Sequence, residues 1–371
     1  MQGLLINWCS FVAVMVRPLK RRRFIAVSGV AGLASIAGCI GDDVDDDANG
    51  DDTDDVDDAD DVDDTDDTDD TDDTDEEEDI EDADPDEGGE VLSWHAGGTG
   101  GTYYPLSGEM KSIVEANTPH GLQVQSTGAS VENVGSLGRE EADFALIQND
   151  IAFFAVNGTG IEDFEGQPIE NIRGVATLYP ETIHIITQAD SGIESVEDLE
   201  GATVNTGDLG SGTQVNALQI LESAGVEDFE EQNTDFASAT DQIRDGDIDA
   251  AVIVGGWPVG SVEELASTED ISLVAVDGDV RDAVMEDAEW MAADTIPGGT
   301  YDGVDDDVET VSVQAMIATH EGLDEGIVEE VTTAIFDNTD DFSIKADFIS
   351  ADTAQDGMPI DLHPGAEAYF G

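Results

Sequence analysis

The chain has 371 residues, of which 89 are Asp or Glu and 11 are Lys or Arg, so its formal net charge is −78. It has no basic surface to replace the counterions of phosphates, which excludes nucleic acid as a partner. The two cysteines, Cys9 and Cys39, both precede the part that has the apolar pattern of a packed protein, which excludes a disulfide scaffold.

The charge is distributed unevenly along the chain. Residues 1–41 hold five basic and no acidic residues, 42–90 hold 32 acidic and no basic ones, and 91–371 hold 57 acidic and six basic ones. A folded region with that charge repels itself strongly in dilute buffer. Salt of molar strength shortens the Debye length to about 3 Å and removes most of this repulsion. We therefore interpret the excess of carboxylates as halophilic, an adaptation to high salt.

The N-terminal segment 1–38 predicts export. Basic residues 20–23 precede a modest apolar run, 24–40, which is too short and too rich in Gly, Ala and Ser for a stable membrane span. This order is typical of a signal peptide. Arg21 and Arg22 fit a twin-arginine signal, which is bound by a receptor and does not anchor the protein. Met1 and Met15 are alternative start positions.

Segment 36–39, Ile-Ala-Gly-Cys, resembles a lipobox, in which Cys39 is lipidated and becomes the first residue of the mature chain. The alternative is a stray cysteine in an uncleaved signal anchor. Residues 39–90 then form the lipidated end and an acidic disordered tether, since the Asp-Asp-Thr triplets at 63–74 repel one another and extend the chain. Calcium binding is the alternative, but the EF-hand spacing is absent.

From Val91 the pattern predicts two α/β units. In the first, strands at 91–95, 122–126 and 144–148 alternate with helices at 103–116 and 131–138, an order that implies a parallel sheet. In the second, strands are predicted at 175–178, 183–188, 203–206, 250–254, 271–276 and 311–317, and helices at 195–199, 213–223 and 327–336. Two such units joined by crossing segments enclose a cleft, and ligands bind at the carboxyl ends of the strands.

Several segments together resemble the TAXI class of solute receptors, which serve tripartite ATP-independent periplasmic (TRAP) transporters. The segments are Gly98-Thr-Gly-Gly-Thr-Tyr-Tyr-Pro105, Ser126-Thr-Gly-Ala-Ser-Val-Glu-Asn133, Ala142-Asp-Phe-Ala-Leu-Ile-Gln-Asn149, Leu178-Tyr-Pro-Glu181, Val196-Glu-Asp-Leu-Glu-Gly201, Gly210-Ser-Gly-Thr213, Asp245-Gly-Asp-Ile-Asp-Ala250 and Pro297-Gly-Gly-Thr-Tyr301. The third segment usually ends in Gln-x-Asp, and here Asp150 holds the place of the final Asp.

The resemblance implies a two-lobed α/β fold of the class II periplasmic-binding-protein type, with the ligand cleft between the lobes. Lobe 1 is expected over 91–178 plus about 297–371, and lobe 2 over 179–296. The ligands of the family include acidic solutes such as glutamate and 2-oxoglutarate.

Two glycine loops are the strongest candidates for the binding site. The first glycine loop, residues 97–102, follows the first strand and precedes a helix, so that backbone N–H groups and the helix N-terminus can approach an anion. Its third glycine is missing, because Tyr103 stands there, so no dinucleotide fingerprint is formed. The second glycine loop, residues 210–213, stands in the same position before a helix of the second unit. The alternative for each loop is a tight turn or a helix cap that binds nothing.

Hydroxyls at a further strand-to-helix turn and two aromatic residues complete the expected ligand-binding set, to which the resemblance adds Gln148. The set is Thr99, Gly100, Gly101, Thr102, Tyr103, Ser126, Thr127, Ser130, Gln148, Tyr179, Gly210, Ser211, Gly212, Thr213 and Trp257. Arg173 is the best candidate for a charged clamp, although an ion pair is the more common role, and His184 is expected to be a core residue.

Enzyme motifs are lacking. The sequence has no Gly-x-Ser-x-Gly elbow, no His-Glu-x-x-His and no metal-ligand spacing among its five histidines. We therefore expect no catalysis and no cofactor. The expected function is a lipid-anchored solute receptor on the extracellular face of the membrane, which captures a small carboxylate and delivers it to a separate, ion-gradient-driven TRAP permease. The alternative is a surface-anchored hydrolase or a sensor domain on the same fold.

Overall fold

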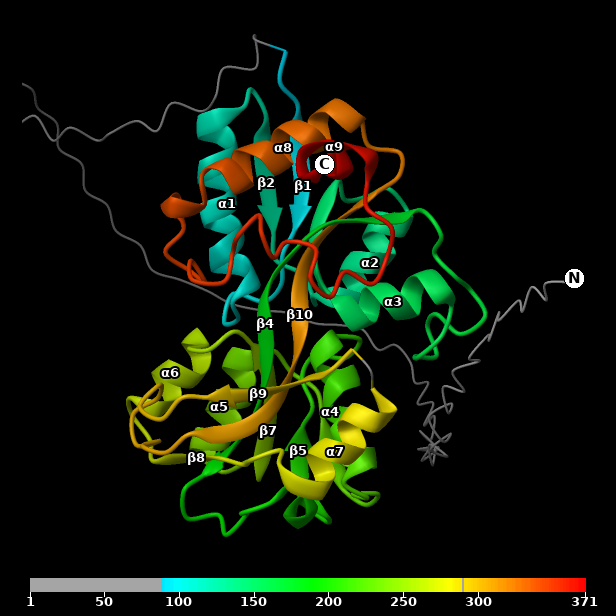
Figure 1. Cartoon of the computed structure of the whole chain (residues 1–371). Helices are drawn as coiled ribbons and strands as arrows, with labels where there is room; N and C mark the ends of the chain where they lie inside the picture. The colour runs from blue at the N-terminus through cyan, green and yellow to red at the C-terminus, as the bar shows by residue number, and fades with distance from the viewer. Residues whose placement is uncertain (1–87, 289) are drawn as a thin grey trace, which may run out of the picture. The chain divides into compact units, whose positions relative to one another are not determined.

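The computed structural model describes residues 88–288 and 290–371, and the segments predicted as a signal (Arg21, Arg22) and lipidation site (Cys39) lie outside these residues. One mixed sheet runs through the described part in the order β2-β1-β3-β10-β4-β7-β5-β6, with β8 paired to β4 and β9 to β10 (Figure 1). Helices flank this sheet in two lobes. The predicted two-lobed α/β architecture is thereby confirmed.

Lobe 1 begins with three parallel strands, β1 (Val91–His95), β2 (Gly121–Gln125) and β3 (Phe144–Gln148). The helices between and after them are α1 (Tyr103–Asn117), α2 (Ser130–Gly138) and α3 (Asn149–Asn157). Every residue of β3 is buried, with alternate side chains in the two hydrophobic cores of this lobe. A parallel strand covered by helices on both faces needs this continuous apolar run, which is why the sequence pattern located β3 correctly.

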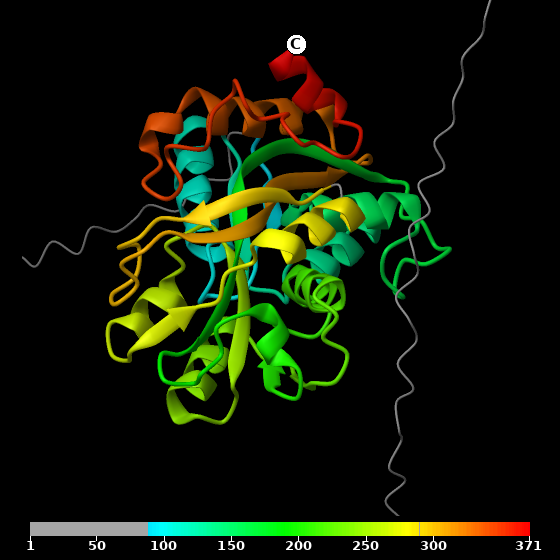
Figure 2. The ribbon, with the colours of Figure 1, turned by 60° about the horizontal axis from the view of Figure 1, so that its bottom comes forward.

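The C-terminal part of the chain returns to lobe 1. Helix α8 (Glu325–Asp337) packs beside α1, and α9 (Pro364–Phe370) packs on α8 (Figures 1 and 2). Trp94 stacks on Phe144 at a centroid distance of 5.5 Å, and its indole Nε1 donates to Ser107 Oγ at 2.9 Å. These contacts fix α1, and therefore the glycine loop before it, on the sheet.

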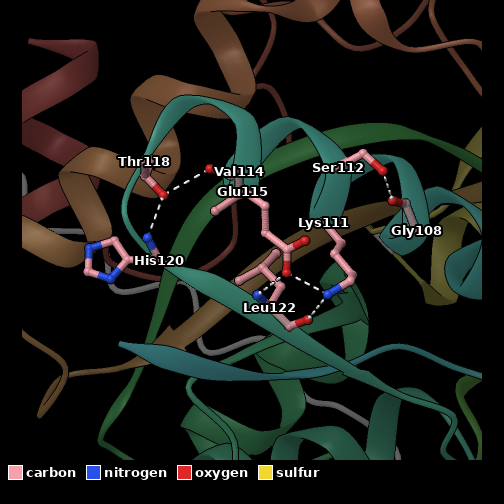
Figure 3. Close-up of polar contacts among 8 residues, drawn as sticks. All are labelled: Gly108, Lys111, Ser112, Val114, Glu115, Thr118, His120 and Leu122. Carbon is pink, nitrogen blue, oxygen red and sulfur yellow. Dashed lines mark hydrogen bonds and ion pairs between the residues drawn. The ribbon is translucent and has the colours of Figure 1, made fainter. Parts of the chain in front are cut away.

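Polar contacts also join the end of α1 to the start of β2 (Figure 3). Leu122 N donates to Glu115 Oε1 at 3.0 Å, while Lys111 Nζ donates to the carbonyl oxygen of Leu122 at 3.0 Å and pairs with Glu115. The backbone N–H and the Oγ1 of Thr118 both donate to the carbonyl oxygen of Val114, each at 2.9 Å, where the helix ends.

Lobe 2 contains the strands β5 (Thr203–Asn205), β6 (Glu230–Gln232), β7 (Ala250–Gly255), β8 (Ile271–Leu273) and β9 (Ala292–Ile296). Its helices are α4 (Gly212–Ser223), α5 (Phe236–Asp245), α6 (Gly260–Ala266), α7 (Gly278–Asp287) and a 3-10 turn at Val196–Leu199. Alternate residues of β7 again belong to two cores, one on each face of the sheet.

Two long strands, β4 (Ile172–Gln188) and β10 (Val308–His320), run through both lobes and pair antiparallel. Two separate strands, 175–178 and 183–188, were predicted where β4 is continuous. The prediction stopped at Pro180, which has no N–H for a ladder bond. The structure accommodates Pro180 opposite Gln314 next to a register shift between Gln314 and Met316, so the strand continues through an irregularity.

The cores on the two sides of the crossing use different parts of the chain. The lobe 1 cores take residues 92–179 and 315–370, apart from Val215 and Trp290, and the lobe 2 cores take residues 183–313. The lobe limits 91–178, about 297–371 and 179–296 stay a prediction. Among the described residues, no helix combines the length and the apolar character that a bilayer crossing requires.

Candidate functional site

A cavity of about 60 Å³ lies between the lobes, with room for a few water molecules. It brings together predicted residues from both glycine loops and from two strand ends. Those residues are Gly100, Gly101, Thr102, Tyr103, Ser130, Gln148, Ser211, Gly212 and Thr213. Residues that were not predicted complete the lining, notably Glu181, Asp208, Asp235, Phe236 and Ala129.

The lobes meet most closely at Gly212, the first residue of α4. A Cβ atom built there would lie 1.7 Å from Gln148 Oε1 and 3.2 Å from Ser130 Oγ, both of which belong to lobe 1. No side chain larger than hydrogen fits in that space while Gln148 keeps its position. Gly212 is therefore a glycine because the two lobes close on it, a reason that concerns packing across the cleft.

Hydrogen bonds across the cleft hold the same arrangement. Ser261 N donates to the carbonyl oxygen of Gly100 at 3.3 Å, and Thr102 Oγ1 donates to that of Gly256 at 3.3 Å. Asn216 Nδ2, on α4, donates to Asp150 Oδ2, on α3, at 2.7 Å, and both side chains are fully buried. The structure thus shows the lobes in a closed state.

Three helices begin at the cavity wall: α1 after the first glycine loop, α2 at Ser130 and α4 at Gly212. Free backbone N–H groups and the positive end of the helix dipole make such positions favourable for an anion. Ser211 Oγ caps α4 by accepting from Gln214 N at 3.1 Å, so its hydroxyl has the structural role that was the alternative. The N–H groups of Gly101, Gly210 and Ser211 already have acceptors within the loops, so the N–H groups at the helix starts are the ones suited to a carboxylate.

Glu181 is a carboxyl group in this wall, 3% exposed, on the crossing strand β4. Its Oε2 accepts from Tyr103 Oη at 2.8 Å and its Oε1 from Tyr179 Oη at 3.3 Å. Burial raises the pKa of Glu181 to about 8, against these hydrogen bonds, which favour the ionised form. Residue patterns did not select it, because acidic residues occur throughout the chain, although it is the last residue of the segment Leu178-Tyr-Pro-Glu181 that carries the resemblance.

The backbone at Ala129 is a second feature of the wall that sequence patterns missed. Its φ is +66°, in a region that favours glycine. The chain bends there between Gly128 and Ser130, and this bend brings Ser130 to the start of α2, where its Oγ accepts from Gln148 N at 3.1 Å. Non-glycine residues keep such angles only where the surrounding structure determines them.

The remaining predicted residues do not line this cavity. Ser126 Oγ donates to the carbonyl oxygen of Gly97 at 3.0 Å, and Thr127 Oγ1 donates to Asn133 Oδ1 at 2.7 Å, so both hydroxyls hold the loop. Tyr179 lies behind the wall, bonded to Glu181. Gly210 and Trp257 are absent from the lining as well.

Thr99 belongs to a larger cavity of about 680 Å³, which shares Gly100, Gly101 and Thr102 with the smaller one. Lys345 also lines this larger cavity and donates from Nζ to the carbonyl oxygen of Trp257.

Several other candidates have structural partners. Arg173 pairs with Glu321 at 2.6 Å, as the ion-pair alternative stated. His184 is buried and contacts Tyr301 Oη at 2.9 Å through Nε2. Asn149 Oδ1 accepts from Gln314 N at 3.0 Å. Within residues 88–288 and 290–371, no cluster of three His, Cys, Asp or Glu side chains is placed to hold a metal ion.

Asp150 generates a stability prediction. Burial raises its pKa to about 6, above its usual 3.8. A carboxyl whose folded pKa is raised destabilises the fold once the unfolded chain ionises, so the wild type should lose stability relative to Asp150→Asn as pH rises from 3 to 7. The expected difference is about 3 kcal/mol. Denaturant unfolding of both proteins in molar KCl measures it, with Asp352→Asn, an exposed position, as control. The prediction would be contradicted if the free energies of unfolding of wild type and Asp150→Asn changed with pH in parallel.

Comparison with known proteins follows this geometry. Solved structures of similar arrangement include the periplasmic binding protein BugD (11% identity, covering 67% of this chain and 82% of that one, TM-score 0.47). Others are a putative L-cystine ABC transporter protein from Listeria monocytogenes (13%, 71% and 98%, 0.42) and an ancestral arginine-binding protein bound to arginine (13%, 69% and 95%, 0.42). The model of the NMT1-like family matches residues 95–371, which include all of both lobes after β1. The chain belongs to the NMT1-like family.

Proposed function

We propose that this protein is an extracytoplasmic solute-binding receptor that captures a small carboxylate between its lobes. The observation that carries the proposal is the convergence of both glycine loops, one from each lobe, on a single cavity. Three helices begin at that cavity, and the free backbone N–H groups of helix starts favour an anion without any basic side chain. A site between two lobes is suited to capture and release.

The closed state supports a capture mechanism. The cavity of about 60 Å³ is smaller than sites that hold small organic ligands, which measure about 300–1,000 Å³. The adjoining cavity of about 680 Å³ lies in that range, so only entry into the smaller cavity requires the lobes to separate, which breaks the Asn216–Asp150 and Ser261–Gly100 bonds. Because β4 and β10 connect the lobes, they are the segments that bend on opening.

The finer proposal is a TAXI-type receptor of a TRAP transporter. Its support is the set of segments that line the cavity, in which the first loop, Ser130, Gln148 and the second loop recur in the order expected for that class. In this proposal a twin-arginine signal exports the chain, lipid on Cys39 anchors it at the extracellular face of the membrane, and a separate permease receives the solute.

The first test is a ligand screen in molar KCl, in which thermal unfolding is measured with amino acids, dicarboxylates and 2-oxo acids. A solute at 100 times its dissociation constant should add roughly 2.7 kcal/mol of stability. Product analysis of the same mixtures separates the alternatives, because turnover of a bound solute indicates the hydrolase. Stabilisation by none of these classes would contradict the receptor.

Gly212→Val should weaken solute binding by roughly ten- to a hundredfold, the equivalent of one charge-assisted hydrogen bond. The reason is that the new side chain collides with Gln148 and keeps the lobes from closing. Calorimetric titration and thermal unfolding of the variant measure binding and stability separately. The matched control is Gly108→Val, where a Cβ meets nothing within 4 Å. Unchanged affinity together with a lower melting temperature would remove Gly212 from the binding site.

Cys39→Ser should release the protein into the medium or leave it unprocessed, because the thiol is the lipid acceptor. Fractionation of cells and the mass of the mature protein measure the outcome. Cys9→Ser is the control, since Cys9 lies in the part that is removed. A Cys39→Ser protein of normal mature mass in the membrane fraction would contradict the anchor.

A further inference from the structure

The smaller cavity has a charge pattern that a simple anion does not match. Three carboxyl groups line it, those of Glu181, Asp208 and Asp235, and none of the described lining residues is Lys or Arg. Asp235 caps α5, where its oxygens accept from Ser238 N at 3.1 Å and Ser238 Oγ at 2.7 Å. Glu181 and Asp208 are not used in this way, so they remain available to a ligand.

Two acceptor atoms in the wall also lack a donor. Gln148 is 3% exposed, and its Oε1 is buried without a hydrogen-bond partner among the described residues. The carboxylate of Asp208 is half-buried and has neither a hydrogen bond nor an ion pair among the described residues. A buried acceptor without a donor costs about 1–3 kcal/mol, so Gln148 Oε1 indicates a missing donor group.

Glu181 has capacity for one more donor. An ionised carboxylate offers about four acceptor positions. Hydrogen bonds from Tyr103 and Tyr179 occupy two of them. Lys345 interacts with this carboxyl as a charge, but its Nζ donates to the carbonyl oxygen of Trp257. A ligand ammonium in the cavity would fill a free acceptor position and add a positive charge in direct contact with Glu181.

The other half of the wall has the opposite preference. The first glycine loop and the starts of α2 and α4 present N–H groups, which suit a carboxylate. Donors on one side and carboxyls on the other are complementary to a zwitterion. A dianion without an amine would leave Gln148 Oε1 unpartnered, and it would face Asp208, and Glu181 once that carboxyl is ionised, with like charge.

We infer that the solute is a zwitterion with a protonated amine beside its carboxylate, an amino acid in preference to the amine-free 2-oxo acid, and that Glu181 is the residue that selects for the amine. The inference rests on the proposed function and narrows its ligand class. Asp208 and Gln148 Oε1 are the secondary acceptors.

The inference predicts whether the affinity of a ligand rises or falls with pH. The groups that face Glu181 are Tyr103 from α1, Tyr179 from β4, Gln148 from β3, Asp150 from α3 and Lys345 from the C-terminal segment. Because burial places the pKa of Glu181 at about 8, the carboxyl is mostly protonated at pH 7. An ammonium ligand needs the ionised form, so its affinity should rise roughly eightfold between pH 7 and 8.5. A 2-oxo acid needs the neutral form, and its affinity should fall roughly fourfold.

The experiment compares matched pairs that differ only in the amine: glutamate with 2-oxoglutarate, alanine with pyruvate, and leucine with 4-methyl-2-oxopentanoate. Titration calorimetry in molar KCl at pH 7 and 8.5 gives the affinity of each. The expected result is tighter binding of the amino acid in the pair that fits, with an affinity that rises with pH. Tighter binding of the 2-oxo acid, or an amino-acid affinity that falls over this range, would overturn the inference and leave the receptor intact.

The variant Glu181→Gln keeps the shape of the side chain and removes its charge. It should abolish the rise with pH and weaken the amino acid at pH 8.5 by tenfold or more, while the 2-oxo acid binds at least as well as before, which shows that the site is still folded. Glu321→Gln, at the exposed ion pair with Arg173, is the control. It should change neither the rise of affinity with pH nor the affinities at pH 8.5. An unchanged pH profile in Glu181→Gln would remove Glu181 from the selection. Binding of no member of any pair would overturn the receptor proposal itself.

Discussion

The antiparallel pairing of β4 with β10 is the interaction on which the rest of the structure depends. These strands make the two lobes parts of one sheet, and their ladder runs from the core of lobe 1 into the core of lobe 2. Backbone hydrogen bonds of this kind do not depend on side-chain charge. A chain with so many carboxylates can therefore keep its lobes connected at the point where ion pairs would be least dependable.

The same crossing places the cavity. Tyr179 and Glu181 lie on β4 beside the register shift near Pro180, and such irregularities turn side chains away from a regular ladder. The glycine loops then approach from the two lobes, α1 and α2 on one side and α4 on the other. Each loop alone is a common strand-to-helix turn. Together they form a binding wall because the crossing strands hold them opposite each other.

Sequence patterns located the parts of this site that depend on local chemistry. Residues of both glycine loops and Ser130 were found because a helix start after a strand has a recognisable composition, and Gln148 was found through the resemblance to a known family; all of them except Thr99 and Gly210 line the cavity. Ser126 and Thr127 were assigned to the same wall, but they hold the loop from behind, since hydroxyl groups do not reveal their direction. Glu181 was missed because its distinction is burial, and burial at one position of an acid-rich chain is decided by tertiary packing. Helix α3 was also missed, because it begins directly after β3 without a loop between them. Strand β9 was missed because most of its residues are exposed and show no alternation of apolar and polar residues.

High salt bears differently on the two kinds of carboxylate in this protein. At molar ionic strength, charges on the surface interact over about 3 Å, so the many exposed acidic residues hardly influence one another or a distant solute. Pairs inside a closed cavity are screened much less, because ions do not enter it. Long-range attraction of a solute is therefore weak in molar salt, and the contacts made after closure must supply the selectivity. A buried carboxyl opposite helix N-termini meets that requirement, since its charge acts only on a ligand that the lobes have already enclosed.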